Sequence, residues 1–323
     1  MTCSVGEAVR ASAFVADARR AFRGRSLILR SRSAVPRGRR ASASARMGAP
    51  SLTGWNLDGC PEGLILTLAR RLEAEWRMLP GVRDAPCAED LRSVDAVAPD
   101  GDPATRIRIE NLCLQTDAFR KMHLEVAWGL GGLEVLHCVV YPWADVPAPV
   151  YAADLVAFGG RVTLGIADAC PVTADLSLPE PYVQTAARLR AEMLEACPAI
   201  EPRPLPEWGE AILSPEACVC VGPPKEDFPE QSQAAAFAEY AAALHAEHLR
   251  LVAETIERPF VPGGEHGGSA RERLEAQIRF CEKQLLNDKT RRVLERSMGS
   301  ESTERYMTEV LFDVTADTPT FPK

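Results

Sequence analysis

The sequence predicts an α/β fold, a three-layer α/β/α sandwich with a central antiparallel sheet. Three observations support this prediction: strand patterns fill residues 105–170, a helical pattern precedes them, and helical patterns dominate after residue 177. Hairpin-connected strands with helices before and after them indicate an antiparallel sheet between helical layers. The chain has no evident internal repeat, and we expect one domain over residues 47–323.

The helix that precedes the strands begins at Pro61. Its apolar side chains recur every four residues, at Leu64, Leu68, Leu72 and Trp76. This spacing places them on one face of a helix, which we expect to pack on the sheet.

The strand region opens with residues 105–114, which alternate in polarity, and continues with a hairpin over residues 121–128 and 133–141. The glycine-rich sequence between the two hairpin strands suits a tight antiparallel turn. A second hairpin joins residues 150–158 to residues 162–169 through the turn Gly-Gly-Arg. The sequence therefore predicts a meander of antiparallel strands.

Polar side chains interrupt these apolar strands. His123 and Glu125 point away from the apolar face of their strand. His137 lies directly opposite one of them if the turn holds three or five residues, and diagonal to them if it holds four. Asp154 stands in the middle of the next strand. Because burying an unpaired polar group costs roughly 2–7 kcal/mol, these residues need partners or a function.

Three helical stretches follow the strands, separated by proline- or glycine-rich segments. They cover residues 178–197, 231–256 and 271–298. His245 and His248, three residues apart in the second stretch, are interpreted as part of a solvated helix face rather than as metal ligands.

The first fifty residues have the composition of an organelle transit peptide. They contain eleven Arg, no Lys and only two acids, Glu7 and Asp17, with many Ala and Ser and no long apolar centre. We predict a disordered transit peptide over residues 1–46, cleaved between about Ala41 and Ala49. The alternative is a basic tail that binds nucleic acid.

The rest of the chain is acidic. Without its basic N-terminal segment it carries 26 basic and 43 acidic residues, a formal net charge of −17, so nucleic acid is not an expected partner. No apolar run approaches the roughly 20 residues of a membrane span. The ten cysteines lack metal-ligand spacing, which favours buried free thiols in a reducing compartment.

Common catalytic motifs are missing: the sequence has no GxGxxG, Walker loop, GxSxG or HExxH. The candidate cluster is therefore His123, Glu125, His137 and Asp154, which forms either a set of structural strand residues or a group of proton donors. A cationic stretch also needs explanation, and it is either a solvated helix face or a contact for substrate carboxylates and an acidic protein. Its members are Lys289, Arg291, Arg292 and Arg296.

Four ordered blocks carry a resemblance to a known family. They are IENLCLQTDAFRKMHLEVAWGLGGLEVLHCVVYP, YAADLVAFGGRVTLGIADACPV, LPEWGE and NDKTRRVLERSMGSESTERYMTEVLFDV. From about Ile107 to Val314 the chain resembles the ferredoxin-dependent bilin reductases. It departs from the family pattern at Tyr151, Ala152 and Phe280.

The resemblance implies a single-domain α/β/α sandwich that binds biliverdin IXα between the sheet and the C-terminal helices. It also implies an enzyme without bound metal or flavin. Reduced ferredoxin then delivers single electrons, the bilin carries the radical, and the protein supplies protons. We expect a monomer in the plastid stroma.

Residue roles follow from the same resemblance. Asp154 matches the aspartate that protonates the bilin, His137 its histidine partner, Glu125 the glutamate linked to reduction of the exocyclic vinyl group, and His123 a supporting histidine. The remaining matches are substrate contacts at Thr163, Gln284, Asn287 and Lys289, and a ferredoxin-facing pair, Arg291 and Arg292.

Glu125 and His137 together indicate the branch that forms phycocyanobilin by four-electron reduction. Two alternatives stay open. One is a sister reductase that makes phytochromobilin or phycoerythrobilin, and the other is a bilin carrier without catalysis.

Overall fold

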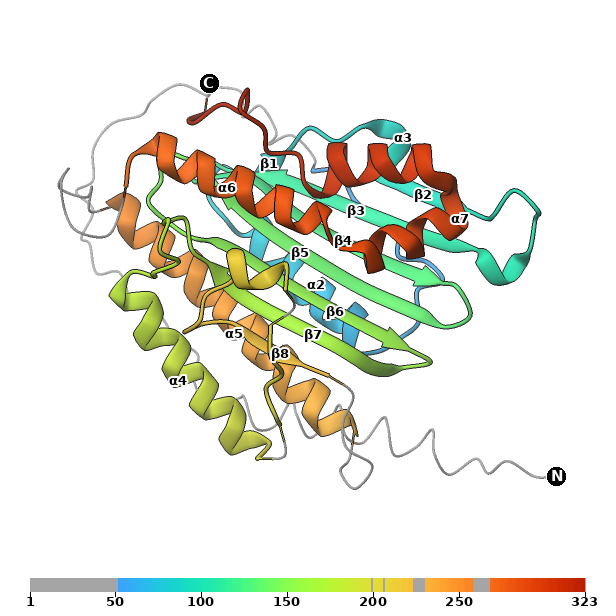
Figure 1. The fold of residues 1–323 in the computed structure, drawn as a ribbon, viewed down its shortest axis with the longest axis horizontal. Helices are drawn as coiled ribbons and strands as arrows, with labels where there is room; N and C mark the ends of the chain where they lie inside the picture. The colour runs from blue at the N-terminus through green and yellow to red at the C-terminus, as the bar shows by residue number, and fades with distance from the viewer. Residues whose placement is uncertain (1–51, 199, 206, 223–229, 258–267, 323) are drawn as a thin grey trace, which may run out of the picture. The chain divides into compact units, whose positions relative to one another are not determined.

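The computed structural model describes residues 52–322 apart from 199, 206, 223–229 and 258–267 (Figure 1). The predicted transit peptide, residues 1–46, lies outside the described residues. Residues 50–323 form one compact unit.

An eight-stranded antiparallel sheet forms the middle layer. Its strand order is β1-β3-β4-β5-β6-β7-β8, and β2 pairs with β3. The strands are β1 (Arg83–Asp84), β2 (Ser93–Ala96), β3 (Ile107–Gln115), β4 (Phe119–Gly129), β5 (Leu133–Pro142), β6 (Val150–Phe158), β7 (Arg161–Cys170) and β8 (Val219–Val221).

The turn between β4 and β5 holds three residues, because Gly129 pairs with Leu133. Gly129 has a φ of 129°, and a Cβ there would lie 2.2 Å from the Arg106 carbonyl oxygen, so only glycine fits. This turn length places His137 directly opposite Glu125, one of the registers expected from the sequence.

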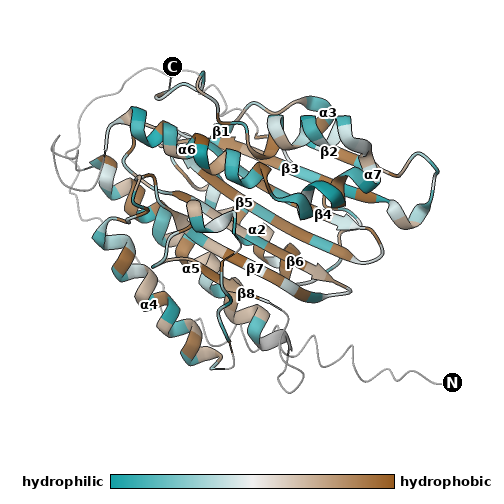
Figure 2. Ribbon diagram, in the orientation of Figure 1, coloured by the Kyte–Doolittle hydropathy of each residue, from teal (hydrophilic) through white to brown (hydrophobic). Residues whose placement is uncertain are grey.

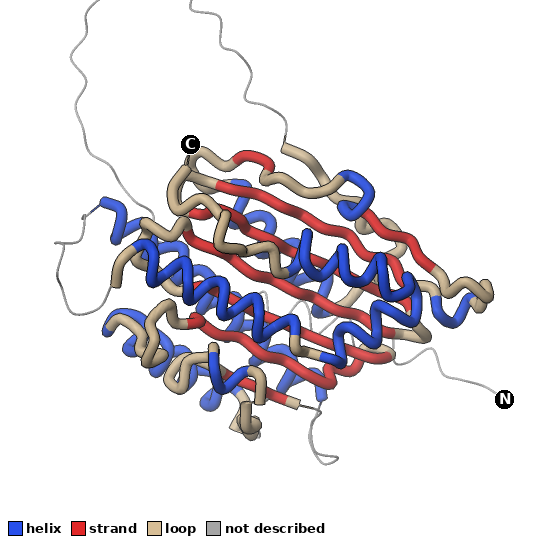
Figure 3. The backbone as a smooth tube through the Cα atoms, turned by 45° about the horizontal axis from the view of Figure 1, so that its top comes forward, coloured by secondary structure: helices blue, strands red, loops and turns tan. Residues whose placement is uncertain are grey.

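One face of the sheet is covered by α2 (Leu64–Arg77), α4 (Glu180–Ala196) and α5 (Glu230–Glu257). The predicted apolar face of α2 is confirmed, and its residue Trp76 is fully buried. Figure 3 shows helices on both sides of the strands, and the predicted three-layer sandwich is confirmed. In Figure 2 the central strands are mainly hydrophobic, whereas the helices α6 and α7 in front of them are largely hydrophilic.

The other face is covered by C-terminal elements. These are α6 (Ala270–Leu285), α7 (Asp288–Tyr306) and a π-helix, η3 (Met307–Leu311). The remaining helices among the described residues are short: α3 (Glu89–Arg92), η1 (Pro103–Thr105) and η2 (Gly209–Ala211).

The helical stretch expected over residues 271–298 is divided into two helices. Asn287 separates them, and its side-chain oxygen accepts the Lys289 backbone N–H at the start of α7. A second break follows at Gly299, whose φ is 74°. Arg291 consequently reaches Glu304 across the kink, at 2.5 Å, although thirteen residues separate them.

The prediction that His245 and His248 lie on a solvated face is wrong, because both are fully buried. Trp76 Nε1 donates to His245 Nε2 at 2.7 Å. The other ring nitrogen, Nδ1, must then carry the proton of neutral His245 and donate to Glu75 Oε2, 2.8 Å away. The tyrosine hydroxyl of Tyr182 lies 3.0 Å from His248 Nδ1. The alanine-rich helix α5 packs on both the sheet and α4. This packing encloses the imidazole rings of His245 and His248.

No helix in the described part of the chain is long and apolar enough to cross a membrane. The nine described cysteines are free thiols, and all but Cys87 are buried. The prediction of buried free thiols therefore holds for eight of the described cysteines.

Candidate active site

A row of polar residues crosses four adjacent strands on the face covered by α6 and α7. Asn111 of β3 pairs with Glu125 of β4, Glu125 with His137 of β5, and His137 with Asp154 of β6. Because side chains alternate along each strand, residues in one such row share a face of the sheet. We call these four residues the polar row.

His137 and Asp154 form a close pair within the polar row. His137 Nδ1 lies 2.6 Å from Asp154 Oδ1, so the ring donates to the carboxylate. Burial lowers the pKa of His137, but the Asp154 charge and hydrogen bond outweigh burial, and its pKa lies above the ordinary value. The pair therefore favours the protonated form of the His137 ring.

The opposite end of the polar row is linked to α7. The Tyr306 hydroxyl lies 2.5 Å from Glu125 Oε2 and 2.9 Å from Asn111 Oδ1. Burial raises the pKa of Glu125. The same Asn111 oxygen is 2.8 Å from His123 Nε2, and burial, with Lys121 nearby, holds the pKa of His123 well below its ordinary value. This end consequently favours neutral side chains.

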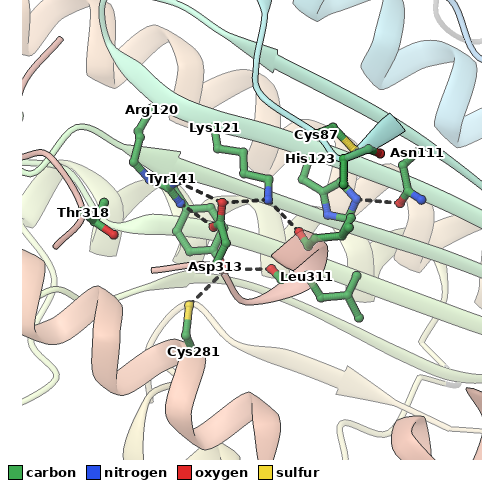
Figure 4. A network of polar contacts seen from close by, with 12 residues as sticks. Cys87, Asn111, Arg120, Lys121, His123, Tyr141, Cys281, Leu311, Asp313 and Thr318 are labelled. Carbon is green, nitrogen blue, oxygen red and sulfur yellow. Dashed lines mark hydrogen bonds and ion pairs between the residues drawn. The ribbon is translucent and has the colours of Figure 1, made fainter. Parts of the chain in front are cut away.

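The segment after α7 is fastened over the row by buried charges (Figure 4). Lys121 Nζ donates to the Val310 carbonyl at 2.6 Å and lies 3.0 Å from Asp313. Arg120 meets the same carboxylate at 2.8 and 3.2 Å. Despite burial, Lys121 and Arg120 hold the pKa of Asp313 well below its ordinary value. Phe312 then places its ring edge-on to His137, 5.8 Å between centroids.

Exposure rises towards the Asp154 end of the polar row. The Asp154 side chain is 25% exposed, whereas His137 is 9% exposed. Nearby apolar residues that pack against the same core, Val135, Val156 and Leu164, are also only partly buried. A substrate can therefore reach the row over β5, β6 and β7 more easily than past α7.

The sequence model of the ferredoxin-dependent bilin reductases matches residues 69–313. The chain belongs to this family. This bilin reductase is an oxidoreductase, and its family depends on ferredoxin as electron donor.

Curated relatives agree with the family assignment. The reductase is 34% identical over 253 residues to the phycocyanobilin:ferredoxin oxidoreductase of Trichodesmium erythraeum, covering 77% of this chain and 93% of the relative. It is 32% identical over 255 residues to the protein of the same name from a Synechococcus species, covering 79% and 94%.

A solved structure supports the fold. The tomato phytochromobilin synthase, crystallised in complex with biliverdin, superposes with a TM-score of 0.56 and 15% identity. The match covers 78% of this chain and 85% of the tomato chain. At this identity the likeness concerns the fold alone.

The four expected substrate contacts lie on β7, on α6 and at the start of α7. Thr163 lies at a bulge in β7 and donates to the Val156 carbonyl at 3.2 Å. Gln284 is buried near the end of α6. Asn287 caps α7, and Lys289 is exposed in its first turn. Among the described residues, no hydrogen bond joins these four to the polar row.

The two arginines expected to face ferredoxin differ. Arg291 is partly buried and paired with Glu304, whereas Arg292 is exposed and donates to the Asp288 carbonyl at 3.1 Å. Arg292 therefore has the more accessible charge of the two.

Sequence reasoning missed Asn111 and Tyr306. Alternation along residues 105–114 puts Asn111 on the same side as Ile107 and Ile109, which hid its polar role. No local signal connects Tyr306 to Glu125, 181 residues earlier. It also missed Asp168 of β7, which is fully buried, accepts the Ser214 N–H at 2.7 Å, and has its pKa raised to about 8 by burial.

No group of three or more His, Cys, Asp or Glu residues in the described part of the reductase could hold a metal ion.

Proposed function

We propose that the reductase converts biliverdin IXα to phycocyanobilin with four electrons from reduced ferredoxin and four protons. The observation that carries this proposal is the polar row, in which a charged pair and a neutral acid lie on one sheet face. The relatives named phycocyanobilin:ferredoxin oxidoreductase, at 32–34% identity, support it.

Each proton enters the bilin together with a single electron, so the bilin passes through radical intermediates. Asp154 is the most exposed acid of the polar row and passes the first proton, received from the His137 ring, to the bilin. His137 holds a proton beside it, because their hydrogen bond stabilises the imidazolium. An acid and its donor in contact allow rapid renewal of the proton at the bilin.

Glu125 supplies the proton for the exocyclic vinyl group. Burial raises the pKa of Glu125 and so favours the neutral form, which can donate a proton. His123, held through Asn111 in the same network, supports this end of the row.

The proposed substrate and partner contacts lie on β7 and on the C-terminal helices. The exposed Lys289 suits a bilin propionate, and Thr163, Gln284 and Asn287 are the other proposed contacts. The pair Arg291 and Arg292 is proposed to meet ferredoxin through an acidic surface of that protein.

The proposed location is the plastid stroma, reached through the transit peptide at residues 1–46. A fluorescent protein fused after residue 60 tests this directly. Import into plastids with removal of the segment is expected, and a cytosolic signal would contradict it.

The decisive experiment is anaerobic turnover of biliverdin IXα by the protein starting at Met47, with reduced ferredoxin and chromatographic identification of products. Phycocyanobilin is the expected product. Phytochromobilin or phycoerythrobilin would instead assign a sister activity, and binding without reduction would indicate a carrier.

A further inference from the structure

The hydroxyl of Tyr306 is placed between two oxygens. Glu125 Oε2 lies 2.5 Å from it and Asn111 Oδ1 lies 2.9 Å from it. A tyrosine hydroxyl has one proton to donate, so it can serve as donor in only one of these contacts. The other contact needs a proton from elsewhere.

The orientation of the Asn111 amide decides which contact that is. Asn111 Nδ2 lies 2.9 Å from the Leu91 carbonyl oxygen. Turning the amide over would bring two acceptor oxygens together at that distance in a buried site, an unfavourable arrangement. The NH₂ group therefore faces Leu91, and Oδ1 faces both Tyr306 and His123.

An amide oxygen only accepts hydrogen bonds. Asn111 Oδ1 thus receives one proton from Tyr306 and another from His123 Nε2, which lies 2.8 Å away. Because Tyr306 donates its single hydroxyl proton to Asn111, its contact with Glu125 is a hydrogen bond only if the Glu125 carboxyl group carries a proton.

We propose that Glu125 is a carboxylic acid in the resting enzyme, donating to Tyr306 in a chain that continues to Asn111, and that Tyr306 is the positioning residue for this proton. The inference rests on the proposed function only for the use to which the proton is put. The hydrogen-bond chain stands on the contacts alone.

The surroundings of Glu125 agree with a neutral acid. It is 6% exposed and forms no ion pair with another described residue. Lys121, four residues earlier on β4, is engaged by Asp313 and the Val310 carbonyl. His137, opposite Glu125 on β5, gives its Nδ1 proton to Asp154. No described cation is therefore committed to a Glu125 carboxylate.

Tyr306 can also hydrogen-bond to Glu125 after Glu125 has transferred its proton to a substrate. The hydroxyl can rotate and donate to the new carboxylate, while His123 continues to satisfy Asn111. Tyr306 keeps its own proton in both states. It contacts Glu125 before and after transfer, and the Tyr306–Asn111 contact, 2.9 Å with a proton between the two oxygens, should lengthen when that proton turns to Glu125.

Infrared spectroscopy of the substrate-free protein tests this chain. A carboxylic acid C=O band that shifts in D₂O and disappears in Glu125→Gln is expected for the unmodified protein near neutral pH. In Tyr306→Phe the acid loses its acceptor, so the same band should move to higher frequency. Tyr151→Phe is the matched control: Tyr151 is equally buried but donates to the Ala241 carbonyl on the opposite sheet face, and its loss should leave the band in place.

Absence of the Glu125 band in the unmodified protein would overturn the proposal, even if Tyr306→Phe did not fold. A band unaffected by Tyr306→Phe, in a variant whose circular dichroism matches the parent, would overturn the role of Tyr306.

Turnover separates this inference from the proposed function. Tyr306→Phe should slow the vinyl-reduction step about tenfold, the effect of about one hydrogen bond, and leave the Asp154-dependent step unchanged. If the unmodified protein shows the infrared band but does not reduce biliverdin, the proposed function fails and the hydrogen-bond chain remains.

Discussion

His137 and Asp154 are direct partners on adjacent strands, and a 2.6 Å hydrogen bond joins His137 Nδ1 to Asp154 Oδ1. The other ring nitrogen, His137 Nε2, is buried without a hydrogen-bond partner among the described residues. The pair therefore fixes the ring orientation and leaves the Asp154 carboxyl group, at 25% exposure, as its part that a substrate can reach.

Replacing Asp154 with Asn tests the proton supply. The amide cannot supply an acidic proton or stabilise the imidazolium, so turnover should fall at least about 100-fold while biliverdin still binds. Anaerobic turnover and bilin absorbance measure the two effects. Asp317→Asn, at an exposed position, is the control and should behave like the parent. Full activity in Asp154→Asn would sink the assignment.

The His137–Asp154 pair also predicts a pH dependence of stability. The pKa of His137 in the folded protein lies above the ordinary 6.5, so the folded state binds the proton more tightly. Stabilisation by the charged ring is complete below about pH 6.5 and is lost as pH rises through the raised pKa. Urea unfolding of the parent and of His137→Gln, at several pH values, should give a difference in unfolding free energy that shrinks as pH rises. A difference that grows with pH would contradict this sign.

Glu125→Gln removes the acid but keeps the shape of the side chain. A partly reduced bilin that retains its exocyclic vinyl group should accumulate, because Asp154 and His137 are unchanged. Chromatography of the turnover mixture identifies it, with Glu301→Gln, an exposed position, as the matched control. Complete conversion to phycocyanobilin by Glu125→Gln would remove Glu125 from the mechanism.

His245 is expected to stabilise the fold without affecting the product. His245→Leu leaves the buried Trp76 N–H without its acceptor and should lower the unfolding free energy by about 1–3 kcal/mol. His245→Gln restores an acceptor oxygen and should recover part of that loss. Urea unfolding and product analysis check both points; equal losses in the two variants would argue against the Trp76 hydrogen bond.

Charge reversal at Arg292 tests the ferredoxin surface. Arg292→Glu should raise the KM for ferredoxin roughly several-fold at low salt, with unchanged biliverdin binding, because an exposed charge acts mainly on association. Arg271→Glu, an exposed arginine at the start of α6, is the control. An equal effect of both variants would indicate net charge rather than a specific contact.

The layers of the fold could be predicted because local patterns encode them. Alternation in β3 to β7 and the four-residue repeat of α2 depend only on neighbouring residues. The same alternation placed His123 and Glu125 on one face, and the three-residue turn at Gly129 set their register.

The errors arose where distant segments meet. His245 and His248 look like a polar helix face until α4 and the sheet enclose them. The break at Asn287 depends on a capping side chain inside a strongly helical pattern. Tyr306 could not be linked to Glu125 from sequence, since only the packing of α7 on β3 and β4 brings them together.

The late position of Tyr306, Phe312 and Asp313 in the chain has a consequence for biosynthesis. Strands β3 to β7 are contiguous in sequence and can form hairpins as they leave the ribosome, whereas the residues that cover the polar row emerge long after them. During that interval the nascent sheet exposes an apolar face containing the polar row. We expect the nascent chain to need chaperone protection until the C-terminal segment arrives, and to gain bilin affinity only then.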